Sequence, residues 1–167
     1  MPAALNKVKP SGRAFVFIVH YPKEMRAYLN VELPDHVELF DILVWTYENN
    51  IATPPVYGYK NNWQAILYYK GRDAGPLNGE SMIERFTVHR DPMPIGKYHQ
   101  WQKPDDLAER FIRHSTKRGD LVFDPFAGTG TFLLAASKLG RRGVGCEIDK
   151  KMIEIARKRG CEIRLKA

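Results

Sequence analysis

The chain has 167 residues with a formal net charge of +7, and 44% of the residues are apolar. This length and balance fit one globular domain with a sizeable core. No apolar run approaches the roughly 20 residues of a membrane span, no secretory signal opens the chain, and two cysteines are too few for a disulfide framework or a zinc cluster. We therefore expect an intracellular, cytoplasmic protein that binds neither membrane nor metal.

The positive charge is concentrated near the C-terminus, because residues 138–167 contain ten Lys or Arg and four Asp or Glu. A basic surface attracts nucleic acid through its phosphates. A solvated helix face rich in lysine would give the same composition, so the sequence leaves both interpretations open.

The first half of the chain predicts three strands and one helix. The run RAFVFIV at residues 13–19 is almost wholly apolar and is typical of a strand buried on both faces, as in a parallel sheet. Helical spacing predicts a helix over Pro22–Asn30. Two further apolar runs, Leu39–Thr46 and Trp63–Tyr69, predict strands joined by a proline-containing loop at Asn49–Asn61.

The second half alternates helices and strands after an irregular stretch at residues 71–100, whose length predicts a functional or a mobile loop. Such alternation predicts an α/β sheet with parallel strands. The expected elements are helices from Asp105 to Gly119, at Thr131–Leu139 and at Lys150–Arg159, and strands at Leu121–Phe123, Gly143–Glu147 and Glu162–Leu165.

The segment DPFAGTGT at residues 124–131 lies between a predicted strand and a predicted helix. Gly128 and Gly130 allow the backbone to come close to a ligand, and ligands of open α/β sheets lie beyond the carboxyl ends of the strands. Glu147 ends the next predicted strand, where a carboxylate can accept hydrogen bonds from both hydroxyls of a ribose. The pattern predicts a site for an adenosine-containing cofactor.

The carboxylate of Asp124 distinguishes between such cofactors. It would repel the pyrophosphate of a dinucleotide, and the third glycine of the dinucleotide pattern is absent. It suits a cofactor with an ammonium group, and S-adenosylmethionine carries both an ammonium and a cationic sulfonium. The sequence predicts S-adenosylmethionine, with an ordinary strand–turn–helix connection as the alternative.

The segment KPDDLAERFIRHSTKRGDLVFDPFAGTGTF resembles the cofactor-binding half of the DNA amino-methyltransferases that make N6-methyladenine or N4-methylcytosine, in the permuted order called the beta class. GVGCEIDKKMIEIARKR is similar to the family's acid-bearing strand and helix, while VKPSGRAFVFI and ILVWTYENNIATPPVYGYKNNWQAILYYKG resemble strands that follow its catalytic region. The resemblance implies an α/β fold with a Rossmann-like S-adenosylmethionine-dependent methyltransferase sheet, incomplete or circularly permuted.

The resemblance also divides the chain and assigns roles. It implies a single methyltransferase-like domain over residues 1–167, with strands after the catalytic region at 1–71, a variable loop or target-recognition insert at 72–102, and the cofactor-binding half at 103–167. The implied cofactor-binding residues are Lys103, Asp124, Phe126, Ala127, Gly128, Gly130, Thr131 and, on the ribose, Glu147.

The family's catalytic tetrapeptide, Asp/Asn/Ser-Pro-Pro-Tyr/Phe/Trp, does not occur in the sequence. In the family it orients the exocyclic amine of a flipped base and stacks on that base. The nearest string is Thr53-Pro54-Pro55-Val56, followed by Tyr57. Threonine is a weaker acceptor and valine cannot stack, so we expect a loop, with a degenerate catalytic motif of Thr53, Pro54, Pro55 and Tyr57 as the alternative.

In the family's order the catalytic strand precedes KPSGRAFVF, so we expect a split or truncated DNA methyltransferase. The missing strand would leave a gap beside Leu121–Phe123. A second polypeptide, a homodimer or the C-terminal CEIRLKA would cover it. An RNA methyltransferase of the guanine-N2 type, or an inactive relic that binds cofactor or DNA, are the alternatives.

A stretch of cations and aromatic rings lies in the irregular region. Such residues suit stacking on bases and contact with phosphates, although the anchoring of a loop in the core would use the same residue types. The candidate nucleic-acid-binding residues are Arg85, Arg90, Lys97, Tyr98 and Trp101.

Overall fold

The structure is a computed structural model, and it describes residues 1–49, 53, 55–79, 81–96 and 98–164. Two compact units divide the chain. The N-terminal unit comprises Met1–Leu77 and Ser81–Pro92, and the C-terminal unit comprises Asn78–Glu80 and Met93–Ala167. The prediction that they form one methyltransferase-like domain stays a prediction.

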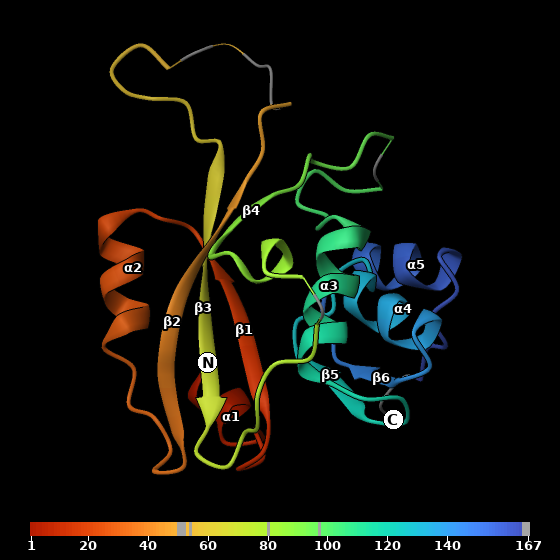
Figure 1. Ribbon diagram of the computed structural model, residues 1–167. Coiled ribbons are helices and arrows are strands. Elements are labelled where there is room, and N and C mark those ends of the chain that lie inside the picture. Colours follow the sequence, from red (N-terminus) through yellow and green to blue (C-terminus); the bar gives the residue numbers. More distant parts are fainter. Residues whose placement is uncertain (50–52, 54, 80, 97, 165–167) are drawn as a thin grey trace. The chain divides into compact units, whose positions relative to one another are not determined.

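The N-terminal unit contains a four-stranded sheet in the order β1-β3-β2-β4 (Figure 1). β3 pairs antiparallel with both β1 and β2, and β4 pairs parallel with β2. The strands are β1 (Arg13–Ile18), β2 (Val37–Thr46), β3 (Trp63–Gly71) and β4 (Val88–Arg90), and the helices are α1 (Pro2–Leu5), α2 (Pro22–Leu29) and the short 3-10 helix η1 (Ile83–Arg85).

The prediction that residues 13–19 form a strand of a parallel sheet, buried on both faces, is wrong. β1 pairs antiparallel with β3, and of its residues only Ile18 is fully buried. β1 lies at the edge of the four-stranded sheet, so one of its sides lacks a strand partner among the described residues. An apolar run indicates that a strand packs against other groups, but it does not indicate whether the neighbouring strand runs parallel or antiparallel to it.

One face of this sheet packs against both α1 and α2. Leu67 and Tyr69 of β3 lie on this face, opposite Val16 and Ala14 of β1. Leu5 of α1 joins the same apolar core, and side chains of α2 pack against it. The alternation of side chains along a strand places these residues on one face, and the two short helices remove that face from water.

The irregular stretch at 71–100 contains two elements that the sequence did not predict, η1 and β4. Val88–Arg90 pairs with Val44–Thr46 of β2, and the indole Nε1 of Trp45 donates a hydrogen bond to Asp91 O at 2.7 Å. A strand of three residues has too little sequence pattern to detect, because its position is set by pairing with β2.

The C-terminal unit follows the predicted alternation of strands and helices. β5 (Leu121–Asp124) and β6 (Arg142–Gly145) pair in parallel, and the predicted helices are confirmed as α3 (Asp105–Ser115), α4 (Thr131–Lys138) and α5 (Lys150–Lys158). α3 ends before the predicted Gly119. The strand predicted at Glu162–Leu165 is wrong for residues 162–164, which carry no strand, and Leu165 lies outside the described residues.

β5 buries one face and leaves the other exposed. Val122 packs against the apolar cluster that Ala108 and Ile112 of α3 form with Ala135 and Ala136 of α4. Its neighbours Leu121 and Phe123 are 50% and 42% exposed. Within the described part of the chain, β5 pairs only with β6. The strand therefore keeps an open edge and an apolar exposed face.

No helix among the described residues combines the length and the apolar character needed to cross a membrane.

We predict that Gly71→Ala destabilises the N-terminal unit. A Cβ at Gly71 would lie 2.6 Å from Lys9 O and would also overlap Pro10 O, both backbone atoms that cannot move aside. The free energy of unfolding, measured by urea denaturation, should fall by about 1–3 kcal/mol. Gly75→Ala is the matched control, since its Cβ would meet no atom within 4 Å; an equal effect of the two substitutions would contradict the close approach.

Candidate functional site

The candidate site lies in the C-terminal unit, where three segments bring charged side chains together. Asp124 ends β5, Glu147 follows β6, and Lys103 comes just before α3. Asp124 interacts electrostatically with both Glu147 and Lys103. The carboxyl ends of two parallel strands thus supply two carboxylates, as expected of a ligand site in an open α/β sheet.

The Asp124 carboxylate is partly removed from water. Burial raises the pKa of this carboxyl above its ordinary value, and the neighbouring Glu147 raises it further. The Phe126 N–H, which donates to Oδ1 at 3.0 Å, and the Lys103 ammonium act in the opposite direction. A buried carboxylate beside a second carboxylate is stabilised by an added cation.

Lys103 is the cation that the chain itself places there. Burial lowers the pKa of its ammonium from 10.5 to about 8, although the Asp124 carboxylate opposes this shift. Nζ also donates to Trp101 O at 3.3 Å. The two groups stabilise each other's charge in a partly desolvated setting.

Glu147 is bound to the backbone in the structure. Its Oε2 accepts from Gly128 N at 2.7 Å, and its Oε1 accepts from Ile148 N at 2.8 Å and Asp149 N at 2.9 Å. A carboxylate has about four lone-pair sites, of which these three bonds use all but one. Two ribose hydroxyls can bind at once only if one of these bonds breaks. The bond to Gly128 connects the turn that follows β5 with the segment that follows β6. The role of Glu147 on a ribose stays a prediction.

The two glycines of the turn have different roles. Gly128 has a φ of +52°, and a Cβ there would meet nothing closer than Phe126 O at 3.9 Å, which leaves open space beside the backbone. Gly130 has a φ of +80° and begins α4, and a Cβ there would lie 2.6 Å from Cys161 Sγ. Gly128 therefore gives room to a ligand, whereas Gly130 gives room to the chain itself.

Exposed apolar side chains flank the carboxylates. Phe126 is 76% exposed and Ile148, next to Glu147, is 97% exposed. Phe126 was predicted from the sequence, whereas Ile148 is a candidate that the structure adds; its sequence signal is an apolar residue directly after the acid. Ala127 is half-buried and donates its N–H to Cys146 O at 2.9 Å, so its part is to hold the turn.

Thr131 points into the unit and not toward the open space. The residue is 4% exposed, and its hydroxyl accepts a hydrogen bond from Arg159 Nη1 at 2.8 Å. The sequence analysis missed Arg159, because an arginine at the end of a basic helix has the pattern of a solvated cation.

Comparison with known proteins identifies the family of the chain. A sequence model of DNA methylases of the N6/N4 type matches residues 3–158. The chain belongs to this DNA methylase family. The predicted resemblance is therefore confirmed.

Two curated relatives of this chain are Type II methyltransferases. M2.DpnII of Streptococcus pneumoniae is 51% identical over 108 residues, which are 62% of this chain and 40% of that protein. M.HpaI of Haemophilus parainfluenzae is 46% identical over 96 residues, which are 55% of this chain and 29% of that protein. The chain spans less than half the length of these relatives. A family of DNA methylases does not favour the guanine-N2 RNA alternative.

Solved structures share the fold of this chain. The crystal structure of the M1.HpyAVI–SAM complex has a TM-score of 0.70 at 25% identity, over 91% of this chain and 76% of that chain. The cytosine-N4-specific PvuII DNA methyltransferase has a TM-score of 0.76 at 16% identity, over 99% of this chain and 69% of that one, a likeness that concerns the fold alone. The predicted fold class, an α/β methyltransferase sheet that is incomplete or permuted, is confirmed.

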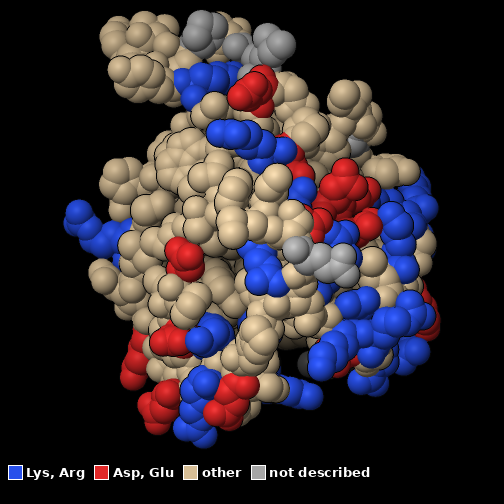
Figure 2. Space-filling model, in the orientation of Figure 1, with Lys and Arg blue, Asp and Glu red and all other residues tan. Residues whose placement is uncertain are grey.

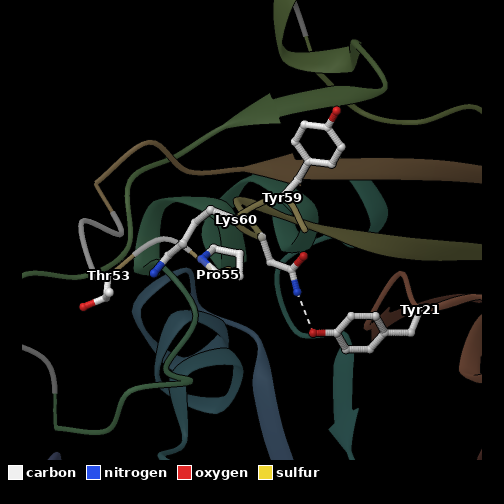
Figure 3. A pocket seen from close by; sticks show the side chains of 6 residues that line it. Tyr21, Thr53, Pro55, Tyr59 and Lys60 are labelled. Atoms are coloured by element: carbon white, nitrogen blue, oxygen red, sulfur yellow. Dashed lines mark hydrogen bonds between the residues drawn. The ribbon is translucent and has the colours of Figure 1, made fainter. Parts of the chain in front are cut away.

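The weak catalytic candidates lie in the N-terminal unit of the chain. Thr53 and Pro55 line an open hollow of about 350 Å³ (Figure 3), together with Tyr21, Tyr59, Lys60 and Asn61. Asn61 Nδ2 donates to the Tyr21 hydroxyl at 2.7 Å. Tyr57 is fully exposed, and Pro54 lies outside the described residues. β2 ends at Thr46, and residues 47–49, which are the described residues between it and Thr53, carry no strand. A catalytic role for this loop stays a prediction.

The candidate nucleic-acid-binding residues lie in both units of the chain. Arg85 belongs to η1 and Arg90 ends β4, whereas Tyr98 and Trp101 lie in the C-terminal unit, where they are 59% and 58% exposed. Lys97 lies outside the described residues. Their role with nucleic acid stays a prediction.

We predict that Lys103 titrates near pH 8 and that Asp124→Asn lowers this midpoint, because the carboxylate raises the pKa of the ammonium. Lysines can be reductively methylated with carbon-13 and followed by NMR, with the Lys103 signal assigned from its loss in Lys103→Arg.

The exposed Asp73 provides the control, since Asp73→Asn should leave the Lys103 midpoint unchanged. A midpoint near 10.5 in the parent chain, or no response to Asp124→Asn, would show that the two groups do not share a buried site.

Proposed function

We propose that this chain carries the cofactor-binding half of an S-adenosylmethionine-dependent DNA amino-methyltransferase that acts on adenine N6 or cytosine N4. The observation that carries the proposal is the partly buried Asp124 carboxylate at the end of β5, beside Glu147 and the open backbone at Gly128. A site of this composition favours a ligand that combines a positive charge with a nucleoside.

The residues present fit S-adenosylmethionine group by group. The ammonium of the methionyl part suits Asp124, because burial and a neighbouring carboxylate destabilise the negative charge of this residue and an added cation would offset that effect. The open space at Gly128 allows that part to approach the backbone. Phe126 and Ile148 provide exposed apolar surface for an adenine ring.

Glu147 is the ribose partner in this proposal, with a hydroxyl replacing the Gly128 N–H on Oε2. The M1.HpyAVI structure, which shares the fold at 25% identity, is a complex with this cofactor and supports the proposal.

The cofactor would supply an electrophilic methyl group on a sulfonium. The residues of this chain bind and orient: Asp124 accepts hydrogen bonds from a cation, and Lys103 limits the net negative charge of the site. Their contribution to rate is positional, since an in-line methyl transfer depends on the alignment of the reacting atoms.

The catalytic strand is proposed to come from a second polypeptide, with a homodimer as the other source. The open edge of β5 supports this, because its backbone N–H and C=O groups can pair with an added parallel strand. The exposed face of Leu121 and Phe123 would then be covered. A strand at this position ends beside Asp124, which is where a base would have to meet the methyl group.

DNA is the proposed substrate, in line with a family of DNA methylases. Figure 2 shows Lys and Arg side chains gathered over the C-terminal unit. Ion pairs of Lys138 with Glu109 and of Arg164 with Glu162 offset part of this charge. The remaining charge supports attraction of phosphates. Among the described residues of this unit, the exposed cations are Arg113, Lys117, Arg118, Lys138, Arg142, Lys150, Lys151, Arg157, Lys158 and Arg164.

We predict that the chain binds S-adenosylmethionine in calorimetry and that Asp124→Ala abolishes the binding. Asp124→Asn keeps an acceptor for the Phe126 N–H but removes the charge, so affinity should fall about tenfold or more, as for the loss of a charge-assisted hydrogen bond. Asp73→Ala, at an exposed position in the N-terminal unit, should bind as the parent does. Unchanged binding by both Asp124 variants would place the cofactor elsewhere.

We predict that the chain alone transfers little methyl to DNA. Transfer of tritiated methyl from S-adenosylmethionine can be measured on duplex DNA and on RNA, with and without the product of the neighbouring gene. Turnover on DNA only with the second polypeptide would support a split enzyme. Strong turnover by the chain alone would refute the proposal that a partner is needed. Labelling of RNA but not of DNA would refute the proposal that DNA is the substrate.

A further inference from the structure

Arg159 follows α5, and its side chain is largely buried, unlike the side chains of the two cations directly before it. Its side chain is 8% exposed, whereas Arg157 and Lys158 on the last turn of the helix are exposed. Removing a guanidinium from water is unfavourable unless its donors find partners. Its contacts therefore indicate what this side chain does.

Half of the guanidinium binds the glycine turn. Nη1 donates to Thr129 O at 2.9 Å, to Thr129 Oγ1 at 3.1 Å and to Thr131 Oγ1 at 2.8 Å. Both threonines are buried, and they flank Gly130 at the start of α4. These bonds fix the backbone directly after the open position at Gly128.

The other half binds the opposite segment of the site. Nη2 donates to Asp105 Oδ1 at 3.0 Å, and Asp105 is the first residue of α3, two positions after Lys103. The Tyr98 ring lies near the guanidinium, with its centroid 5.6 Å from Cζ. One side chain thus connects the turn that follows Asp124 with the segment that carries Lys103.

We propose that Arg159 is a positioning residue that fixes the separation of the two segments lining the cofactor site, the glycine turn and the start of α3. The inference rests on the proposed function, since it concerns the same site. Arginine suits this role because its planar fork donates in two directions at once, which a lysine ammonium on a flexible stem does not reproduce.

The effect falls on the amino-acid part of the cofactor. The turn and Lys103 surround Asp124, the proposed partner of the methionyl ammonium. Phe126 and Ile148, proposed for the adenine, follow the two strand ends, and neither is a hydrogen-bond partner of the Arg159 side chain in the described part of the chain. Loss of Arg159 therefore weakens ligands that carry the amino acid more than ligands that lack it.

Calorimetry with two ligands tests this selectivity on the full chain. Arg159→Met should weaken binding of S-adenosylmethionine about tenfold, as expected for hydrogen bonds to a charged group. Binding of 5′-methylthioadenosine, which lacks the amino acid, should change less than about threefold. Arg157→Met, on the same helix and exposed, is the matched control and should change neither. Equal weakening of both ligands would overturn the proposal, because a merely structural role lowers the folded fraction for both.

Hydrogen exchange without cofactor separates the inference from the proposed function. Arg159→Met should speed amide exchange at residues 128–131 and at 105–109 together, with Arg159→Lys in between. Thr131→Val removes one acceptor of Arg159 and keeps the shape, so it should speed exchange in the turn even if Arg159→Met folds poorly. Unchanged exchange in either segment, or a uniform rise over the unit, would overturn the inference. A parent chain that binds no S-adenosylmethionine would instead refute the proposed function.

Discussion

The C-terminal unit depends on one constraint, which is that the Asp124 carboxylate at the end of β5 is partly buried. Burial destabilises its charge, and the unit offsets this with the Phe126 N–H and the Lys103 ammonium. The Phe126 N–H can reach the carboxylate because a turn directly follows β5, and the Lys103 ammonium can approach it because α3 begins close by. A second acid, Glu147, lies beside this carboxylate and destabilises its charge further, which favours a role in ligand binding over a purely structural one.

The sequence predicted the C-terminal unit well because its signals are local. α3, α4 and α5 have regular apolar spacing, and the glycine turn separates β5 from α4. The N-terminal unit was predicted less well for a physical reason: strand direction and pairing are set by residues distant in sequence. β1 therefore has an antiparallel neighbour where a parallel one was expected, and the three residues of β4 could not be recognised.

Some residues of the candidate site could likewise be predicted from the sequence, and others are recognised only from the packing of the folded chain. Asp124, Gly128 and Glu147 follow from their spacing, since each acid or glycine stands at a strand end or in the turn. The burial of Arg159 could not be predicted, because it depends on Thr129, Thr131 and Asp105 reaching one point from different segments. Thr131 was named as a cofactor residue, yet its hydroxyl serves this internal bond.

The three backbone bonds to Glu147 change what that acid can contribute to recognition. Any hydroxyl pair that takes both of its oxygens exchanges an internal bond to Gly128 for an external one, so the number of hydrogen bonds hardly rises. A single hydroxyl can use the one acceptor site that the backbone leaves on this carboxylate, so it binds without breaking the bond to Gly128. Glu147 by itself therefore favours a pair of hydroxyls little over one hydroxyl, and any selection of ribose over deoxyribose depends on groups other than this acid.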